Sequence, residues 1–173
     1  MTTELEISLI RNADIDRTAY DQCIADARNS LIYAWAFYLD RMAQGWDLIA
    51  GTLRSGVEGA DNGFRGYDYV MPLVSKRKWG VSYLYQPTFV QQLGIFSAHE
   101  ISAEVADKMI SAAKEEFTFA EIHLNYGNPI RWLASRSNFI LDLSPGYDKL
   151  SAAFTRDLKN NLKLSLRTSL HYS

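Results

Sequence analysis

The chain has 173 residues, of which 47% are hydrophobic and 22% are charged, and its formal net charge is -2. This length suits one domain with an appended element, and the apolar share is large enough for a sizeable core. Because the net charge is close to zero, no whole-molecule field attracts DNA or an anionic membrane, and we expect no DNA partner.

The first half of the chain predicts one strand, two helices and three further strands. Polar and apolar residues alternate over residues 4–10, which is typical of a strand with one buried face. Asp14 or Asp16 then caps a helix over residues 16–28, and the apolar face of this helix includes Cys23. The other expected elements are a short helix over residues 31–43 and strands over residues 46–53, 67–75 and 81–85.

Two connections between these strands have an unusual composition. Residues 55–66, SGVEGADNGFRG, hold four of the ten glycines and have no apolar periodicity, which predicts a mobile hairpin loop. Residues 75–80, SKRKWG, bring three basic side chains together. We expect a solvated hairpin tip there rather than a phosphate site.

The second half predicts two more helices, two more strands and a final helix. Ser102 caps the first of these helices, and a strand follows with Ala120, Ile122 and Leu124 on one face. A short helix over residues 128–135, a strand over 137–144 and a long helix from Tyr147 complete the order. Strands mixed with helices in this way favour an α/β sheet covered by helices.

Large apolar side chains recur along the final helix. They repeat every four residues, so the stripe drifts around the helix by about 40° per step. One small domain would leave part of it uncovered, and basic residues fill the other faces. We expect packing against a second half or a dimer partner, with an anionic partner or membrane surface as the alternative. The stripe consists of Leu150, Phe154, Leu158, Leu162, Leu166 and Leu170.

Residues 91–96, QQLGIF, lie between an apolar strand and a helix start in this interpretation. A phosphate loop points consecutive backbone N–H groups at an anion, and glycine lets a diphosphate approach the backbone closely. Gln91, Gln92 and Gly94 fit such a loop, whereas Phe96 places a large side chain where the geometry requires a small one. A coenzyme A loop, a loop for another acyl donor or acceptor, and a purely structural loop remain the alternatives.

The order of elements resembles the GNAT (Gcn5-related N-acetyltransferase) fold, in which the phosphate loop follows the fourth strand. Residues 67–97 in particular are similar to the N-terminal half of FemAB-like proteins, including members from Bacteroidetes. The resemblance covers residues 4–165 and implies two tandem GNAT-like halves, of which this chain supplies one. It divides the chain into a GNAT-like domain over residues 1–146 and a protruding helix over 147–173, which would join a second half or form a homodimer.

The FemAB resemblance implies transfer of an acyl or aminoacyl group to an amine of a cell-wall precursor, or of a similar small-molecule or peptide substrate. Acetyl-CoA or another acyl donor would be the cofactor, and a tRNA partner follows only from the resemblance. The alternative is a non-catalytic GNAT-like half that binds a substrate or pairs with another domain.

The candidate catalytic residues are Glu121 and His123, which alternate along one strand. A Glu or His there could take a proton from an attacking amine, although solvent-facing positions explain the same pattern. Candidate substrate-binding residues are Tyr85, Phe96, Asn125 and Trp35, and core packing is the alternative for the aromatic ones.

Cysteine, histidine and hydropathy set further expectations. One cysteine excludes an intrachain disulfide and fits a reducing compartment, and Cys23 is expected in the core. The histidines at 99, 123 and 171 lack metal-ligand spacing, so we expect no metal. The start of the chain shows no secretory leader pattern, and no apolar run reaches the length of about 18 residues needed for a membrane span. We therefore expect a cytoplasmic protein that does not span a membrane.

Overall fold

The computed structural model describes residues 3–55, 66–130 and 132–167. The chain forms two compact units, Met1–Leu133 and Ala134–Ser173, and the first of them ends before residue 146, the boundary expected from the sequence. The glycine-rich loop expected over residues 55–66 lies almost wholly outside the described residues, as does Leu170 of the apolar stripe. The described chain is mixed α/β, as the element order predicts.

The larger sheet of the first unit is antiparallel throughout, with the strand order β1-β2-β3-β6. Its opening strand confirms the alternation seen over residues 4–10. A strand beginning at Phe96 was not expected, because residues 91–96 were interpreted as a loop. The strands are β1 (Thr3–Ile10), β2 (Asp47–Ser55), β3 (Tyr69–Leu73) and β6 (Phe96–Ser97).

The smaller sheet has the order β4-β5-β7, made of β4 (Ser75–Lys78), β5 (Val81–Tyr85) and β7 (Phe119–Glu121). Strand β5 is antiparallel to β4 and parallel to β7. A parallel pair needs a crossover connection, and α3 (Ala103–Glu116) lies between β5 and β7 along the chain. The SKRK segment is thus itself a strand, and only the tip at Trp79 and Gly80, both with positive φ, forms the turn.

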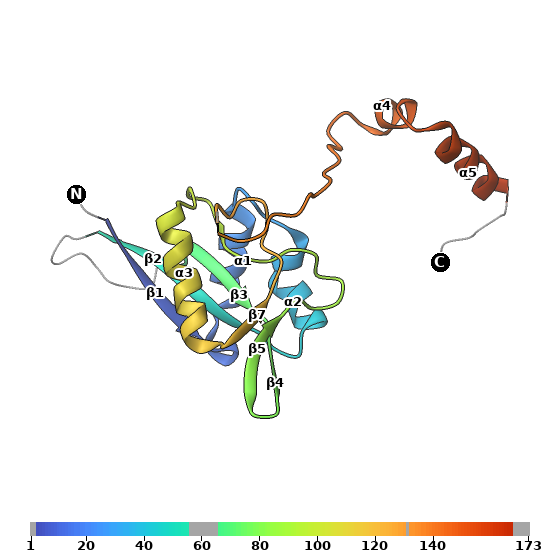
Figure 1. Ribbon diagram of the computed structural model, residues 1–173. Helices are drawn as coiled ribbons and strands as arrows, with labels where there is room; N and C mark the ends of the chain where they lie inside the picture. The colour runs from blue at the N-terminus through green and yellow to red at the C-terminus, as the bar shows by residue number, and fades with distance from the viewer. Residues whose placement is uncertain (1–2, 56–65, 131, 168–173) are drawn as a thin grey trace. The chain divides into compact units, whose positions relative to one another are not determined.

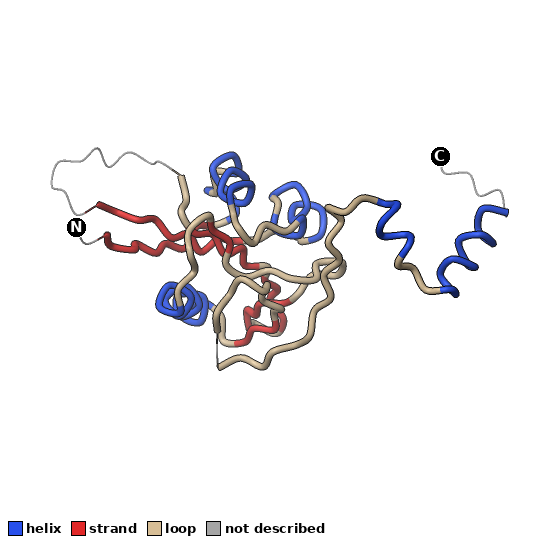
Figure 2. Tube along the Cα trace, turned by 90° about the horizontal axis from the view of Figure 1, so that it is seen from above, coloured by secondary structure: helices blue, strands red, loops and turns tan. Residues whose placement is uncertain are grey.

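Helices cover the larger sheet on both faces (Figures 1 and 2). Helices α1 (Arg17–Asp26) and α2 (Ala36–Met42) pack on one face, and α3 packs on the other. Strand β2 supplies both layers: Leu48 and Ala50 join the core under α1, while Ile49 joins the core under α3. This alternation follows from the two-residue period of a strand.

Asp16, rather than Asp14, caps α1, because its Oδ1 atom accepts a hydrogen bond of 3.0 Å from the Ala19 N–H. The helix expected over residues 31–43 is divided into a 3-10 turn (Ile32–Ala34) and α2. Trp35 between them is extended, and the Ala36 N–H bonds to Asp21 Oδ1 at 2.9 Å instead of continuing a helix. A second 3-10 turn, Asn12–Asp14, precedes α1.

The cap of α3 allows a direct test of local stability. Ser102 Oγ accepts a hydrogen bond of 3.2 Å from the Val105 N–H, as the sequence predicts. We expect Ser102→Ala to lower the free energy of unfolding by about 1 kcal/mol in urea denaturation, because a terminal N–H group loses its partner. Ser111→Ala, an exposed change in the middle of the same helix, is the control and should be neutral or slightly stabilising.

Residues 128–144 differ from the sequence-based expectation. In the described part of this segment neither the expected short helix nor the expected strand forms. Asn128 does not cap a helix, since its side chain bonds to both backbone groups of Ile95, at 2.8 Å and 2.9 Å. Residues 137–144 are exposed, with Phe139 at 94%, and pair with no strand of the described chain.

The second unit contains two helices in place of the long final helix that was expected. They are α4 (Tyr147–Ala152) and α5 (Arg156–Arg167). Thr155 starts the second one, because its Oγ1 atom accepts a hydrogen bond of 3.3 Å from the Leu158 N–H. Leu158, Leu162 and Leu166 of the stripe remain exposed. No helix among the described residues has the length and apolar content to cross a membrane.

Candidate functional site

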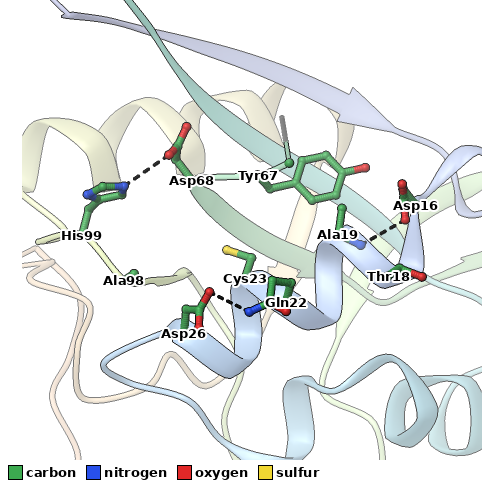
Figure 3. A pocket seen from close by; sticks show the side chains of 11 residues that line it. Asp16, Thr18, Ala19, Gln22, Cys23, Asp26, Tyr67, Asp68, Ala98 and His99 are labelled. Carbon is green, nitrogen blue, oxygen red and sulfur yellow. Dashed lines mark hydrogen bonds and ion pairs between the residues drawn. The ribbon is translucent and has the colours of Figure 1, made fainter. Parts of the chain in front are cut away.

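An open cleft of about 550 Å³ lies between α1 and the segment that enters β3 (Figure 3). Helix α1 and its cap form one wall, the approach to β3 forms the second, and the turn after β6 closes the end. The polar side chains of the cleft are those of Asp16, Thr18, Gln22, Asp26, Tyr67, Asp68 and His99.

Negative charge dominates this cleft. Its lining residues include three carboxylates, and none of the described lining residues is a lysine or an arginine. Each carboxylate is fixed by a hydrogen bond: Asp16 from the Ala19 N–H, Asp26 from Gln22 Nε2 at 2.9 Å, and Asp68 from the Leu53 N–H at 2.7 Å. A cation bound here would meet charges held in place, which favours a cationic ligand.

His99 and Asp68 form a pair within the cleft. The Nε2 atom of His99 lies 3.2 Å from Asp68 Oδ1, and the imidazole ring is half exposed. Ser97 links their backbones, since its hydroxyl donates to the Asp68 carbonyl at 2.6 Å and accepts from the His99 N–H at 2.9 Å. When the hydrogen sits on Nε2, Asp68 accepts it, and Nδ1 carries the free lone pair of a general base.

Cys23 lines the cleft but lacks the properties of a nucleophile. Its side chain is only 6% exposed, and burial raises the pKa of the Cys23 thiol to about 12, with the charges of Asp68 and Asp26 adding to the effect. The thiol is therefore protonated at neutral pH and cannot attack a carbonyl efficiently. This agrees with the prediction that Cys23 belongs to the core.

The backbone of residues 91–96 bonds to other parts of the protein. The Leu93 N–H donates to the His123 carbonyl at 2.8 Å, and the Ile95 N–H donates to Asn128 Oδ1 at 2.8 Å. Gly94 has a φ of 105°, and a Cβ atom there would lie 2.5 Å from Asn128 Oδ1. Glycine is thus required by the conformation and by the approach of Asn128.

The expected succession of strand, loop and helix around residues 91–96 holds in part: β5 precedes the segment and α3 follows it, but Phe96 begins the short strand β6. The segment ends in β6, and α3 begins only at Ala103. A phosphate loop needs free N–H groups at a helix N-terminus, and this segment does not lead into one. Gln91 is exposed, Gln92 is half-buried, and the cofactor role of Gln91, Gln92 and Gly94 stays a prediction.

The residues predicted to bind substrate or to act in catalysis lie outside the cleft. Phe96 and Asn125 are buried, so neither presents a surface to a ligand in this structure. Trp35 and Tyr85 are half-buried against the core under α1, and Lys76 Nζ lies 4.2 Å from the centre of the Tyr85 ring. Roles for them in binding stay predictions.

Glu121 and His123 are both exposed. Glu121 is the last residue of β7, and His123 lies two residues beyond the end of the strand. The His123 N–H donates to Gln86 Oε1 at 3.0 Å, so the backbone of this segment is held by a side chain where strand pairing stops. The catalytic roles of both residues stay predictions.

Asp68 and His99 were not singled out from the sequence. They are separated by 31 positions and belong to no recognisable motif. The available signals were weak: an acid directly before a fully buried strand, and a histidine shortly before a helix cap. Within the described ranges no group of three or more His, Cys, Asp or Glu side chains is arranged to hold a metal ion.

No protein-family model, curated protein or solved structure matches the chain.

Proposed function

We propose that this chain is a GNAT-like domain of FemAB type that binds an amine-bearing ligand in its acidic cleft and transfers an acyl group to that amine. The observation that carries the proposal is the pairing of His99 with Asp68 inside a cleft lined by fixed carboxylates. The carboxylates attract the ammonium form of the ligand, and the imidazole accepts the proton that must leave before the nitrogen can attack.

The topology supports the GNAT part of the proposal. Two helices separate β1 from β2 along the chain, the strands β1, β2 and β3 are antiparallel neighbours, and α3 lies between the parallel strands β5 and β7 in sequence. The GNAT resemblance implies this order of elements. The short β6, inserted before α3, departs from it.

The proposed reaction forms a C–N bond and breaks the bond between the acyl carbon and its leaving group. The ammonium first loses one proton to His99, and the free amine attacks the donor carbonyl. When the tetrahedral adduct collapses, the leaving sulfur or oxygen takes the second amine proton and departs, while the imidazolium returns its proton to solvent. Asp68 orients the imidazole by accepting the hydrogen on its Nε2 atom.

A non-catalytic binding module is the second candidate. The observation that favours it is the use of the Leu93 and Ile95 N–H groups in internal hydrogen bonds, which leaves these two groups unable to bind a donor diphosphate. In this version the cleft recognises the amine, and the chemistry belongs to a partner domain. Both versions share the same ligand.

Calorimetric titration with a tripeptide amide of two alanines and one lysine tests the binding step. We expect Asp26→Asn and Asp68→Asn each to weaken binding about tenfold, since each removes one charge from the cleft. Glu115→Gln, an exposed change on α3, is the matched control and should have no effect. Equal binding of the peptide with both amines acetylated would overturn the proposal in both versions.

Product formation decides between the two versions. Acetyl-CoA and an aminoacyl-tRNA are offered as donors with the same peptide, and the acylated peptide is measured by mass spectrometry. In the catalytic version, His99→Ala lowers kcat/KM about 100-fold or more, while the peptide affinity stays within about twofold. Peptide binding without product from either donor would establish the binding module instead.

A further inference from the structure

A second cavity, of about 170 Å³, lies under α3, between that helix and the parallel pair β5 and β7. It opens on the face of the sheet opposite to α1, so it is separate from the acidic cleft. Its walls are apolar and include Ile110, Phe117, Ile122 and Leu124. The shared face expected for Ala120, Ile122 and Leu124 is confirmed, because all three side chains line this cavity.

Trp132 and Lys114 form the rim of the cavity. The indole Nε1 of Trp132 donates to Asp107 Oδ1 at 3.3 Å, and Lys114 Nζ lies 4.0 Å from the centre of the ring. Trp132 remains 54% exposed, which is unusual for so large an aromatic side chain held by two polar partners. The rim thus combines a flat apolar cover with one positive charge.

We propose that this cavity binds a short-chain carboxylate of about the size of hexanoate, with its hydrocarbon tail inside and its carboxylate on Lys114. A cavity of about 150 Å³ lined by apolar side chains stays dry and takes up benzene, so the volume suits a tail of this size. The inference concerns a site apart from the acidic cleft and does not depend on the proposed function.

The charge at the rim decides the nature of the head group. Lys114 is the only cation among the described lining residues, and within the described chain it forms no ion pair. Asp107 bonds to the indole nitrogen of Trp132 but does not line the cavity, whereas Lys114 does. An anionic head group therefore meets a positive charge in the cavity lining, and an ammonium group would meet repulsion from it.

Calorimetric titration of the full chain with sodium hexanoate, hexanol and hexylamine tests the site. We expect hexanoate to bind with a dissociation constant of about 1 mM or tighter, hexanol to bind about five- to tenfold more weakly, and hexylamine not to bind. Absence of hexanoate binding at about 10 mM, or equal affinity for all three compounds, would overturn the proposal.

Two variants separate the tail from the head group. Ala120→Phe fills the mouth of the cavity from an exposed position and should abolish binding of hexanoate and hexanol, with the fold checked by circular dichroism. Lys114→Met should leave hexanol binding intact and remove the preference for hexanoate. Lys78→Met is the matched control, because Lys78 Nζ also lies over a tryptophan ring, 4.6 Å from the centre of Trp79, and neither residue lines the cavity.

An unchanged preference for hexanoate in Lys114→Met would show that the head group lies elsewhere and would overturn the assigned site. Unchanged hexanoate binding in Ala120→Phe would show that the hydrocarbon tail lies elsewhere and would also overturn the assigned site. If Lys78→Met also lost the preference for hexanoate over hexanol, that preference would come from general surface charge. This result would equally overturn the assigned site.

Discussion

Replacing Phe96 with alanine is expected to lower the free energy of unfolding by about 4 kcal/mol, which is the largest single effect anticipated in this chain. The ring is completely buried in the core under α1, where it packs with Val70, Leu93 and other apolar residues. Deleting it removes apolar surface from the core and leaves a cavity that the neighbours refill only in part.

Equilibrium denaturation in urea, followed by circular dichroism, measures this effect. Phe139→Ala is the control, because Phe139 is 94% exposed and its removal should change the free energy of unfolding by no more than about 0.5 kcal/mol. If Phe96 instead served a substrate, its replacement would change ligand binding and leave the stability of the first unit unaltered. That outcome would contradict the core position.

Local patterns in the sequence correctly predicted the elements that are set by residues close to them along the chain. The alternation over residues 4–10 gives β1, and the capping residues Asp16 and Ser102 fix the starts of α1 and α3. Each helix has a cap and a periodic apolar face within a few residues of each other, and β1 has its alternation, so each signal is contained in one short window.

The predictions failed where a distant partner decides the local conformation. Asn128 followed by proline is typical of a helix start, but its amide bonds to Ile95, 33 positions earlier. The strand expected over residues 137–144 has strong β propensity, and the described chain offers it no neighbouring strand. β propensity reflects packing on a sheet, and alone it does not hold an extended segment in one.

In the candidate site, too, locally determined features were predicted and features that depend on distant residues were missed. Cys23 was assigned to the core correctly because helix periodicity is a local property. Asp68 and His99 become partners only when the end of β6 is brought beside the start of β3, a pairing of Tyr69 with Ser97. A contact set by sheet register across 31 positions has no counterpart in local spacing. Local spacing instead indicated Glu121 and His123, which are close along the chain.

Three asparagines hold residues 91–96 in place. Asn125 Oδ1 accepts from Asn29 Nδ2 at 2.8 Å and from Asn128 Nδ2 at 2.9 Å, while Asn125 Nδ2 donates to the Leu93 carbonyl at 3.0 Å. The Ile95 carbonyl accepts from all three amides. No buried polar side-chain atom in the described residues lacks a partner, so this network is fully satisfied.

We expect Asn125→Ala to lower the free energy of unfolding by about 3 kcal/mol, because the Gly127 N–H loses its acceptor and the Asn29 amide loses one of its two acceptors in a buried setting. Asn29→Ala should cost about 2 kcal/mol. The double variant should lose about 1 kcal/mol less than the sum, since the two amides bond to each other and to the same carbonyl.

A double-mutant cycle in urea measures this coupling, with Asn29 and the exposed Asn160 as an uncoupled control pair. Additive losses, within about 0.3 kcal/mol, would show that the amides act independently and that residues 91–96 are held by other contacts. A clear coupling would assign the glycine at 94 and the hydrogen bonds around it to a buried polar joint between β6 and residues 125–128. A segment fixed in that way is suited to support the nearby sheet rather than to rearrange around a diphosphate.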